Sequence, residues 1–277
     1  SILSSFQTIV GVVLAGVLYT IIPINVLFFI VGGCYILSAI SEMFIRYTSE
    51  FEKRDEKLTV KAVFGDIKDG FKYLASIKAL LVMMICILFV NFFFSPVFDN
   101  FPPYFIATDV TGSNYFFHDK MAPEMWSSFF SVAVGVGSLV MGVVLSMMKQ
   151  KEKCNRTVRW AMMGVSFLVI LMAVFYALFR NNVIGINALL VAVLVILFLI
   201  GVSIILINVP SSTSMMKIVD KDKFGKLSSV LNIGSQGLIP LSMLLGGLAI
   251  TYIRSLVLLI VCASGLLITS LVLFFAP

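Results

Sequence analysis

RYTSEFEKRDEKLTVKAVFGDIKDGFKYLASIK, residues 46–78, is the one long hydrophilic passage in a chain that is otherwise strongly apolar. It carries eight of the twenty Lys and Arg residues. We identify two apolar spans before it and six after it. A charged passage of this length cannot lie in hydrocarbon, so it must lie on one side of a membrane. Its many Lys and Arg residues predict the cytoplasmic side, and that assignment orients every other segment.

The composition of the whole chain is that of an integral membrane protein. Of its 277 residues, 60% are hydrophobic and 12% are charged, and the mean hydropathy is +1.08. A soluble domain carries roughly 25% charged residues. The apolar runs are too long and continuous for barrel strands, so we predict an all-α membrane bundle. The net charge of +6 comes from loops at span ends, where it faces lipid headgroups rather than nucleic acid.

Eight apolar segments are long enough to be membrane helices. We predict that prolines close the first span at Pro23 and the sixth at Pro210, and that Asp99 lies at the proline-broken end of the third. Between residues 60 and 74, apolar side chains recur at a near-helical period, which predicts an amphipathic helix. It could lie on the membrane surface or against cytoplasmic loops of the same protein. The predicted spans are residues 6–22, 25–45, 79–98, 125–148, 158–179, 184–209, 227–250 and 255–275.

The distribution of basic residues tests this orientation. With residues 46–78 inside, the loops predicted to be cytoplasmic carry eight, five and four Lys or Arg residues, in residues 46–78, 149–159 and 211–226. The loops predicted outside carry three, namely Lys120, Arg180 and Arg254. Because every loop follows the same bias, the positive-inside rule predicts a multi-pass topology with these three basic loops in the cytoplasm.

Motifs for catalysis or metal binding are missing from the sequence. It contains no GxxxxGK[ST] phosphate loop, no HExxH pair and no GxSxG elbow. The single histidine, His118, lies in a predicted outside loop, and the four cysteines show no CxxC spacing. We therefore expect no enzyme, no cofactor, no metal site and no disulfide framework.

Polar residues inside the spans are the most informative feature for function. They cost free energy in hydrocarbon, so they usually face a bundle interior or a cavity. Asn91, Ser95 and Asp99 recur at i, i+4 and i+8, which places them on one helical face. For the others, interhelical hydrogen bonds that only hold the bundle together are an alternative. Asp99 could have a functional role or could be a solvated residue at the outer membrane edge. The remaining candidates are Gln7, Asn187, Ser203, Asn208, Ser228, Asn232, Ser235, Gln236 and Ser242.

SPVFDNFPPYFI, residues 95–106, resembles the seventh helix of the macrolide-efflux-like branch of the major facilitator superfamily. NVPSSTSMMKIVDKDKFGKLSSVLNIGSQGLIPLSMLLGGLAI, residues 208–250, looks like its connection between the tenth and eleventh helices. QTIVGVVLAGVLY, residues 7–19, followed by FFIVGGCYILSAISEMFIRY, residues 28–47, is similar to its fifth and sixth helices. The resemblance covers nearly the whole chain and is more specific for the superfamily than for a substrate.

The resemblance implies that this chain holds helices five to twelve of a twelve-helix transporter. Residues 1–45 would then be the last two helices of the N-terminal half, residues 46–78 the linker between halves, and residues 79–277 the complete C-terminal half. The chain begins at Ser1 with no methionine, and we expect about four more spans upstream. Substrate would bind between the halves near the midplane.

Two segments of this chain loosely resemble the family's signature loop between helices two and three. One begins at Gly142 and runs into the basic loop, and the other runs from Asp220 through Gly225 to Lys226. These residues would hold the cytoplasmic ends together in one conformation. They could equally be plain helix caps, because negative charge is favoured just before a helix N-terminus.

The sequence thus predicts a secondary active exporter of small amphipathic, apolar or cationic molecules. The resemblance implies coupling to protons, alternating access, and a bacterial inner (plasma) membrane. The predicted substrate and proton pathway comprises Asn91, Ser95, Asp99, Asn187, Ser203, Asn232 and Gln236. Two other classes stay open: a membrane-embedded sensor or binding subunit that does not transport, and a passive channel or scramblase.

Overall fold

The computed structural model describes residues 18, 22–44, 60–116, 118, 121–147, 154–218 and 221–275, some of them by their backbone alone. This part of the chain is helical and contains no strand. Seven of its helical segments are long and apolar enough to cross a membrane. They match the second to eighth predicted spans, so the predicted all-α membrane class is confirmed. The first predicted span, residues 6–22, lies almost entirely outside the described residues.

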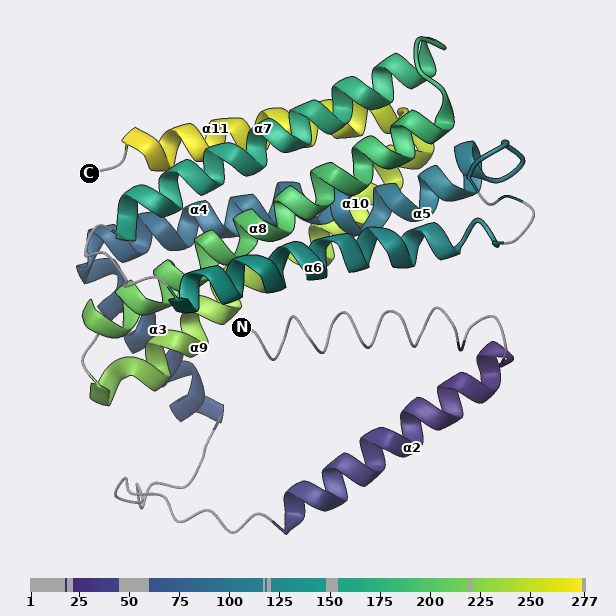
Figure 1. Ribbon diagram of the computed structural model, residues 1–277. Coiled ribbons are helices and arrows are strands. Elements are labelled where there is room, and N and C mark those ends of the chain that lie inside the picture. Colours follow the sequence, from purple (N-terminus) through teal and green to yellow (C-terminus); the bar gives the residue numbers. More distant parts are fainter. Residues whose placement is uncertain are drawn as a thin grey trace.

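Six of these segments pack into one bundle (Figure 1). α7 (Cys154–Arg180) lies beside α11 (Ser255–Phe275) along one edge. α8 (Ile186–Ile218) lies between α7 and α6 (Met125–Met147), while α4 (Lys78–Ser95) packs on α11. α2 (Ile24–Met43) stands apart from the bundle, and its apolar side chains are largely exposed. The bundle is therefore a packed unit of its own.

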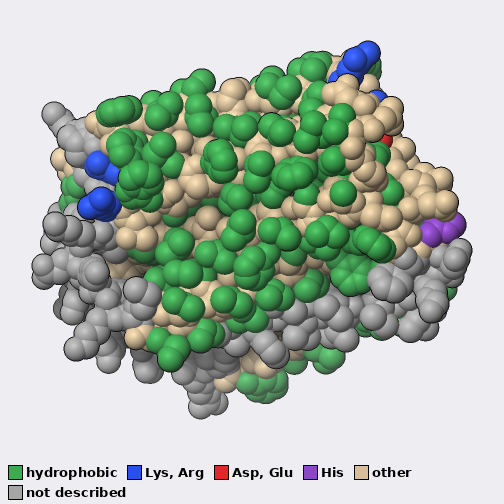
Figure 2. All heavy atoms as spheres, turned by 45° about the horizontal axis from the view of Figure 1, so that its top comes forward, with side chains coloured by type: hydrophobic (Ala, Val, Ile, Leu, Met, Phe, Trp, Pro, Cys, Tyr) green, Lys and Arg blue, Asp and Glu red, His purple; other side chains and the backbone are tan. Residues whose placement is uncertain are grey.

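The outer surface of the bundle has the character expected of a membrane protein. Figure 2 shows one face that is hydrophobic across its middle, with the visible Lys and Arg side chains near its two ends. Large apolar side chains such as Phe167, Val195 and Ile268 are more than half exposed. In water such exposure would favour aggregation, whereas hydrocarbon accepts it.

The first helix of the bundle does not end where the sequence predicted. After α4 the chain continues without a break through η1 (Pro96–Asn100), α5 (Phe101–Phe105) and η2 (Ile106–Val110). The prediction of a proline-broken end near Asp99 was therefore wrong. Two wide π-type turns flank α5, with Phe101 N–H bonded to Pro96 O and Thr111 N–H to Ile106 O. Pro96 begins the first of these turns, whereas Pro102 and Pro103 lie in α5 between them.

A neighbouring helix compensates for one of these prolines. Pro96 has no N–H, so the carbonyl of Phe92 loses its α-helical donor. The hydroxyl of Ser242, on α10 (Ile239–Tyr252), donates a hydrogen bond to that carbonyl oxygen. Helix breakers are tolerated in membrane helices where such partners satisfy the freed backbone groups.

Two more predicted boundaries needed correction. α8 does not end at Pro210 but continues to Ile218, with the proline inside the helix. The seventh predicted span is a pair of helices, α9 (Lys221–Gln236) and α10, interrupted at Gly237 and Leu238. Pro240 lies in the first turn of α10, where its missing N–H needs no partner.

The predicted amphipathic helix is α3 (Val60–Ser76), and it packs on one end of the bundle. Leu74 is completely buried in a small cluster with Met84, Leu227 and Val230. Of the two interpretations that the sequence left open, the structure therefore favours a helix packed against the protein itself. Phe71 and Lys72 remain on its exposed side.

α6 and α8 approach each other closely where they cross. A Cβ atom on Gly137 would overlap the backbone carbonyl oxygen of Phe198, and one on Gly201 would overlap that of Val134. The hydroxyl of Ser138 donates to the carbonyl oxygen of Gly201 across the crossing, at 3.0 Å. Small residues allow this backbone approach, which provides dispersion contacts that lipid cannot replace.

Candidate functional site

A cavity of about 370 Å³ lies between α4, α7, α8 and α9. One part of its wall is apolar, including Phe94 and Met162. The other part is polar but uncharged, and consists of Asn91, Asn208, Ser211, Asn232 and Gln236.

Helical periodicity explains why these side chains share one cavity. On α8, Ile204, Asn208 and Ser211 recur at i, i+4 and i+7, and on α9 Asn232 and Gln236 are four residues apart. Side-chain amides both donate and accept hydrogen bonds. The cavity can therefore bind an uncharged polar group while its apolar wall contacts hydrocarbon or an aromatic ring.

Ser211 provides the clearest sign that the cavity can accept a ligand. Its side chain is buried, with 9% of its surface exposed, and its Oγ has no hydrogen-bond partner in the described part of the chain. A buried hydroxyl without a partner carries a free-energy cost that water or a ligand group would remove. Sequence analysis missed Ser211 because it placed the end of the helix at Pro210. Its spacing from Asn208, three residues away, was the available signal.

Asp99 lies well inside a helical segment that is long and apolar enough to cross a membrane, rather than near its end. The helix continues for eleven residues beyond it, to Val110. At 1.5 Å per residue, the carboxylate lies about 16 Å from that end of the helix. Its side chain is exposed on the surface of the bundle, and the Ser95 hydroxyl donates to its Oδ2 at 2.9 Å. Within the described residues, no Lys or Arg forms an ion pair with it.

The neighbouring Asn100 anchors this part of the helix. Its Nδ2 donates to the carbonyl oxygen of Met243 on α10 at 2.7 Å. Gly246 leaves room for that amide, because a Cβ there would lie 2.7 Å from the Asn100 Nδ2. The π-type turn that carries Asp99 is therefore fixed against α10.

The structure brings together three of the seven predicted pathway residues, Asn91, Asn232 and Gln236. Ser95 and Asp99 form a pair further along the same helix. Asn187 lies at the opposite end of the bundle from α3, and its Oδ1 accepts a hydrogen bond from the Phe116 N–H at 2.8 Å. Ser203 lines a second groove, and its hydroxyl donates to Leu199 O in its own helix.

The predicted gating residues are described only in part. Gly142 is buried in α6, Gly225 and Lys226 belong to α9, and Asp220 lies outside the described residues. The side chain of Lys226 is likewise not described, so the gating role stays a prediction.

Sequence analysis missed a polar cluster that joins three helices near the loop of residues 111–124. Asp109 has a side chain with 7% exposure, and its Oδ1 lies 3.1 Å from Arg180 Nη1. The Tyr176 hydroxyl donates to Asp109 Oδ2 at 3.0 Å and lies 2.7 Å from Ser255 Oγ. A buried carboxylate needs partners of this kind. The cluster therefore ties the end of the Asp99 helix to α7 and α11.

Comparison with known proteins identifies the class of protein. The Major Facilitator Superfamily matches residues 1–243, which is most of the chain. The protein belongs to the major facilitator superfamily, a family of multi-pass membrane transporters for small molecules. No curated protein and no solved structure matches it.

Proposed function

We propose that the protein is a proton-coupled exporter of small amphipathic molecules in a cell membrane, of the macrolide-efflux type. The observation that carries this proposal is Asp99, a carboxylate exposed on the bundle surface deep within a membrane span. A carboxylate facing lipid at that depth is costly, so it should face a water-filled cavity. In a transporter, a carboxylate in such a place can bind a proton or the charged group of a substrate.

The polar cavity supplies the second element of the proposal. Its amides and the Ser211 hydroxyl would bind the polar part of a substrate, and Phe94 with its apolar neighbours would contact the rest. In this view residues 79–277 are the C-terminal half of a twelve-helix transporter, which rocks against an N-terminal half. Residues 220–226 and Gly142 would contribute to closure on the cytoplasmic side.

The test of this function is efflux of a fluorescent amphipathic cation, such as ethidium, from bacteria that express the full-length protein. Energised cells should lose the loaded dye several times faster than cells without the protein, and a protonophore should remove the difference. Equal dye loss with and without the protein would favour the sensor subunit. Faster loss that persists after the protonophore would favour the passive channel.

The proposed orientation has a separate test. Cys154, in a loop predicted to be cytoplasmic, should react with a membrane-impermeant thiol reagent in inside-out vesicles but not in intact cells. In a His118→Cys, Cys154→Ser variant, the new cysteine should react in intact cells, because His118 is exposed in the loop between η2 and α6. That loop lies at the end of the bundle opposite to the start of α7 (Figure 1). The reverse labelling pattern would contradict the orientation derived from the basic loops.

A further inference from the structure

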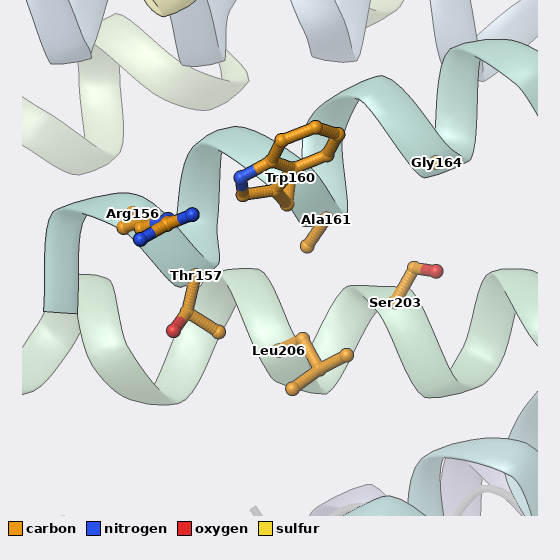
Figure 3. Close-up of a pocket in the computed structure, with 7 residues that line it drawn as sticks. All are labelled: Arg156, Thr157, Trp160, Ala161, Gly164, Ser203 and Leu206. Carbon is orange, nitrogen blue, oxygen red and sulfur yellow. The ribbon is translucent and has the colours of Figure 1, made fainter. Parts of the chain in front are cut away.

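A second hollow lies between α7 and α8, on a different side of this helix pair from the polar cavity. Figure 3 shows this groove, which has a volume of about 650 Å³. Adjacent residues line the two hollows: Ala161 faces the groove whereas Met162 lines the cavity, and Ser203 faces the groove whereas Ile204 lines the cavity. The two helices therefore separate the groove from the proposed substrate site.

The chemistry of the groove changes along its length. At one end lies Arg156, an exposed cation that forms no ion pair with any residue whose side chain the structure describes. One turn further along α7 is Trp160, 56% exposed, whose ring packs edge-on against Phe274 with 5.8 Å between centroids. Leu206 of α8 lies at about the level of Trp160, and beyond them the groove is lined by the small residues Ala161, Ser203 and Gly164 (Figure 3). The groove thus runs from a charged end past an amphipathic ring to an end lined by small residues.

From this sequence of environments we propose that the groove binds one anionic phospholipid, with its phosphate at Arg156 and one acyl chain along Gly164 and Leu206. Trp side chains prefer the level of the lipid headgroups, and basic pockets between membrane helices bind anionic headgroups. The whole groove, from Arg156 to Gly164, runs about 12 Å along the helix. One leaflet of hydrocarbon is about 15 Å thick, so a lipid with its phosphate at Arg156 would have the upper part of one acyl chain in the groove.

The charge around Arg156 favours an anionic headgroup over a zwitterionic one. Residues 149–159 contain five Lys or Arg residues and one acidic residue, Glu152. Arg156 is also the third residue of α7, a helix of 27 residues whose N-terminus adds positive potential. Further along the same two helices, the large apolar side chains of Phe167 on α7 and of Val195 and Leu199 on α8 are exposed in the manner of a lipid-facing surface.

The two tryptophans of the chain make this proposal directly testable. Trp126 is buried in α6 and Trp160 lies in the groove, so Trp126→Phe leaves Trp160 as the only tryptophan of residues 1–277. Any tryptophan elsewhere in the full-length protein is replaced by Phe as well. Trp126→Phe should be tolerated, because the ring packs among aromatic side chains and its Nε1 has no partner within the described residues. The full-length variant is reconstituted in mixed vesicles of phosphatidylcholine and phosphatidylglycerol. Two sets of vesicles are compared: in one the phosphatidylglycerol carries bromine on its acyl chains, and in the other the phosphatidylcholine does. The brominated lipid is present at the same mole fraction in both.

Brominated phosphatidylglycerol should quench Trp160 with an apparent preference of about fivefold over brominated phosphatidylcholine. A preference of about this size is expected when one basic side chain near the membrane surface attracts an anionic headgroup. Arg156→Gln should remove the preference while both lipids still quench. The matched control is Lys72→Gln, which removes an exposed cation on α3 and should leave the preference unchanged. Equal quenching by the two lipids, no quenching by either, or a preference that survives Arg156→Gln would overturn the proposal.

A second variant tests the acyl-chain part of the site with the charge intact. A Cβ on Gly164 meets no atom within 4 Å, so Gly164→Leu should fill the groove without disturbing the fold. It should reduce quenching by brominated phosphatidylglycerol to the level of phosphatidylcholine. Undiminished preferential quenching would show that the lipid does not lie in the groove.

Discussion

Asp99→Asn is expected to abolish uphill efflux in the full-length protein while leaving expression and membrane insertion intact. The substitution keeps the shape of the side chain and its contact with the Ser95 hydroxyl, but it removes the group that can exchange a proton. Because Asp99 is exposed on the bundle surface, the neutral amide should cost little stability. The measurement is the rate of dye efflux as a function of external pH, for the wild type and the variant.

Two controls make this result specific. Asp99→Glu keeps the carboxylate and should retain pH-dependent efflux at a reduced rate. Asp109→Asn alters a carboxylate on the same helix that is already bonded to Arg180 and Tyr176, so it should lower stability and leave the pH profile of the remaining activity unchanged. Normal efflux by Asp99→Asn, with the wild-type pH profile, would assign Asp99 no part in coupling.

The second large effect is expected at the crossing of α6 and α8. Gly201→Ala should lower the stability of the bundle by about 1–3 kcal/mol, because a Cβ there overlaps the Val134 carbonyl oxygen and the helices must separate. Separation would also strain the hydrogen bond from Ser138 to the Gly201 carbonyl. Thermal unfolding in detergent, followed by loss of monodisperse elution, measures this change.

Gly164→Ala is the matched control for that prediction. Gly164 lies inside α7, the neighbour of α8, and a Cβ there meets no atom within 4 Å. Inside a helix, Ala is more favourable than Gly by about 1 kcal/mol. Its thermal midpoint should stay equal or rise. If both substitutions lower the midpoint equally, the close crossing of α6 and α8 is not a source of stability.

The sequence predicted the helices of this fold better than their ends. Apolar runs of membrane-spanning length located seven of the spans, because hydrocarbon leaves the backbone no alternative to a helix. The ends of the third and sixth spans were misplaced. Pro102 and Pro210 misled the prediction, since proline usually ends helices in water. In the bundle, the first helix continues past its prolines: Pro96 begins a wide turn, and the Ser242 hydroxyl supplies the donor that Pro96 removes. The hydrogen bond from Ser242 to the Phe92 carbonyl joins residues 150 positions apart, so no local sequence pattern could predict it.

The candidate site was predictable in the same partial way. Polar residues inside apolar spans identified Asn91, Asn232 and Gln236, which the fold brings to one cavity. Ser211 was missed because the boundary at Pro210 was wrong. Asp109 and Arg180 were assigned to loops, and their pairing depends on how the ends of three helices meet. Chain position alone does not contain that information.

Proton movement in proteoliposomes tests the central claim most directly. The full-length protein is reconstituted with a pH-sensitive dye trapped inside, and an amphipathic cation is added at a fixed membrane potential. Wild-type protein should show a pH change that begins with the addition of the cation and depends on its concentration. Asp99→Asn should show none. Substrate flux without a pH change, or a pH change that persists in Asp99→Asn, would contradict the account.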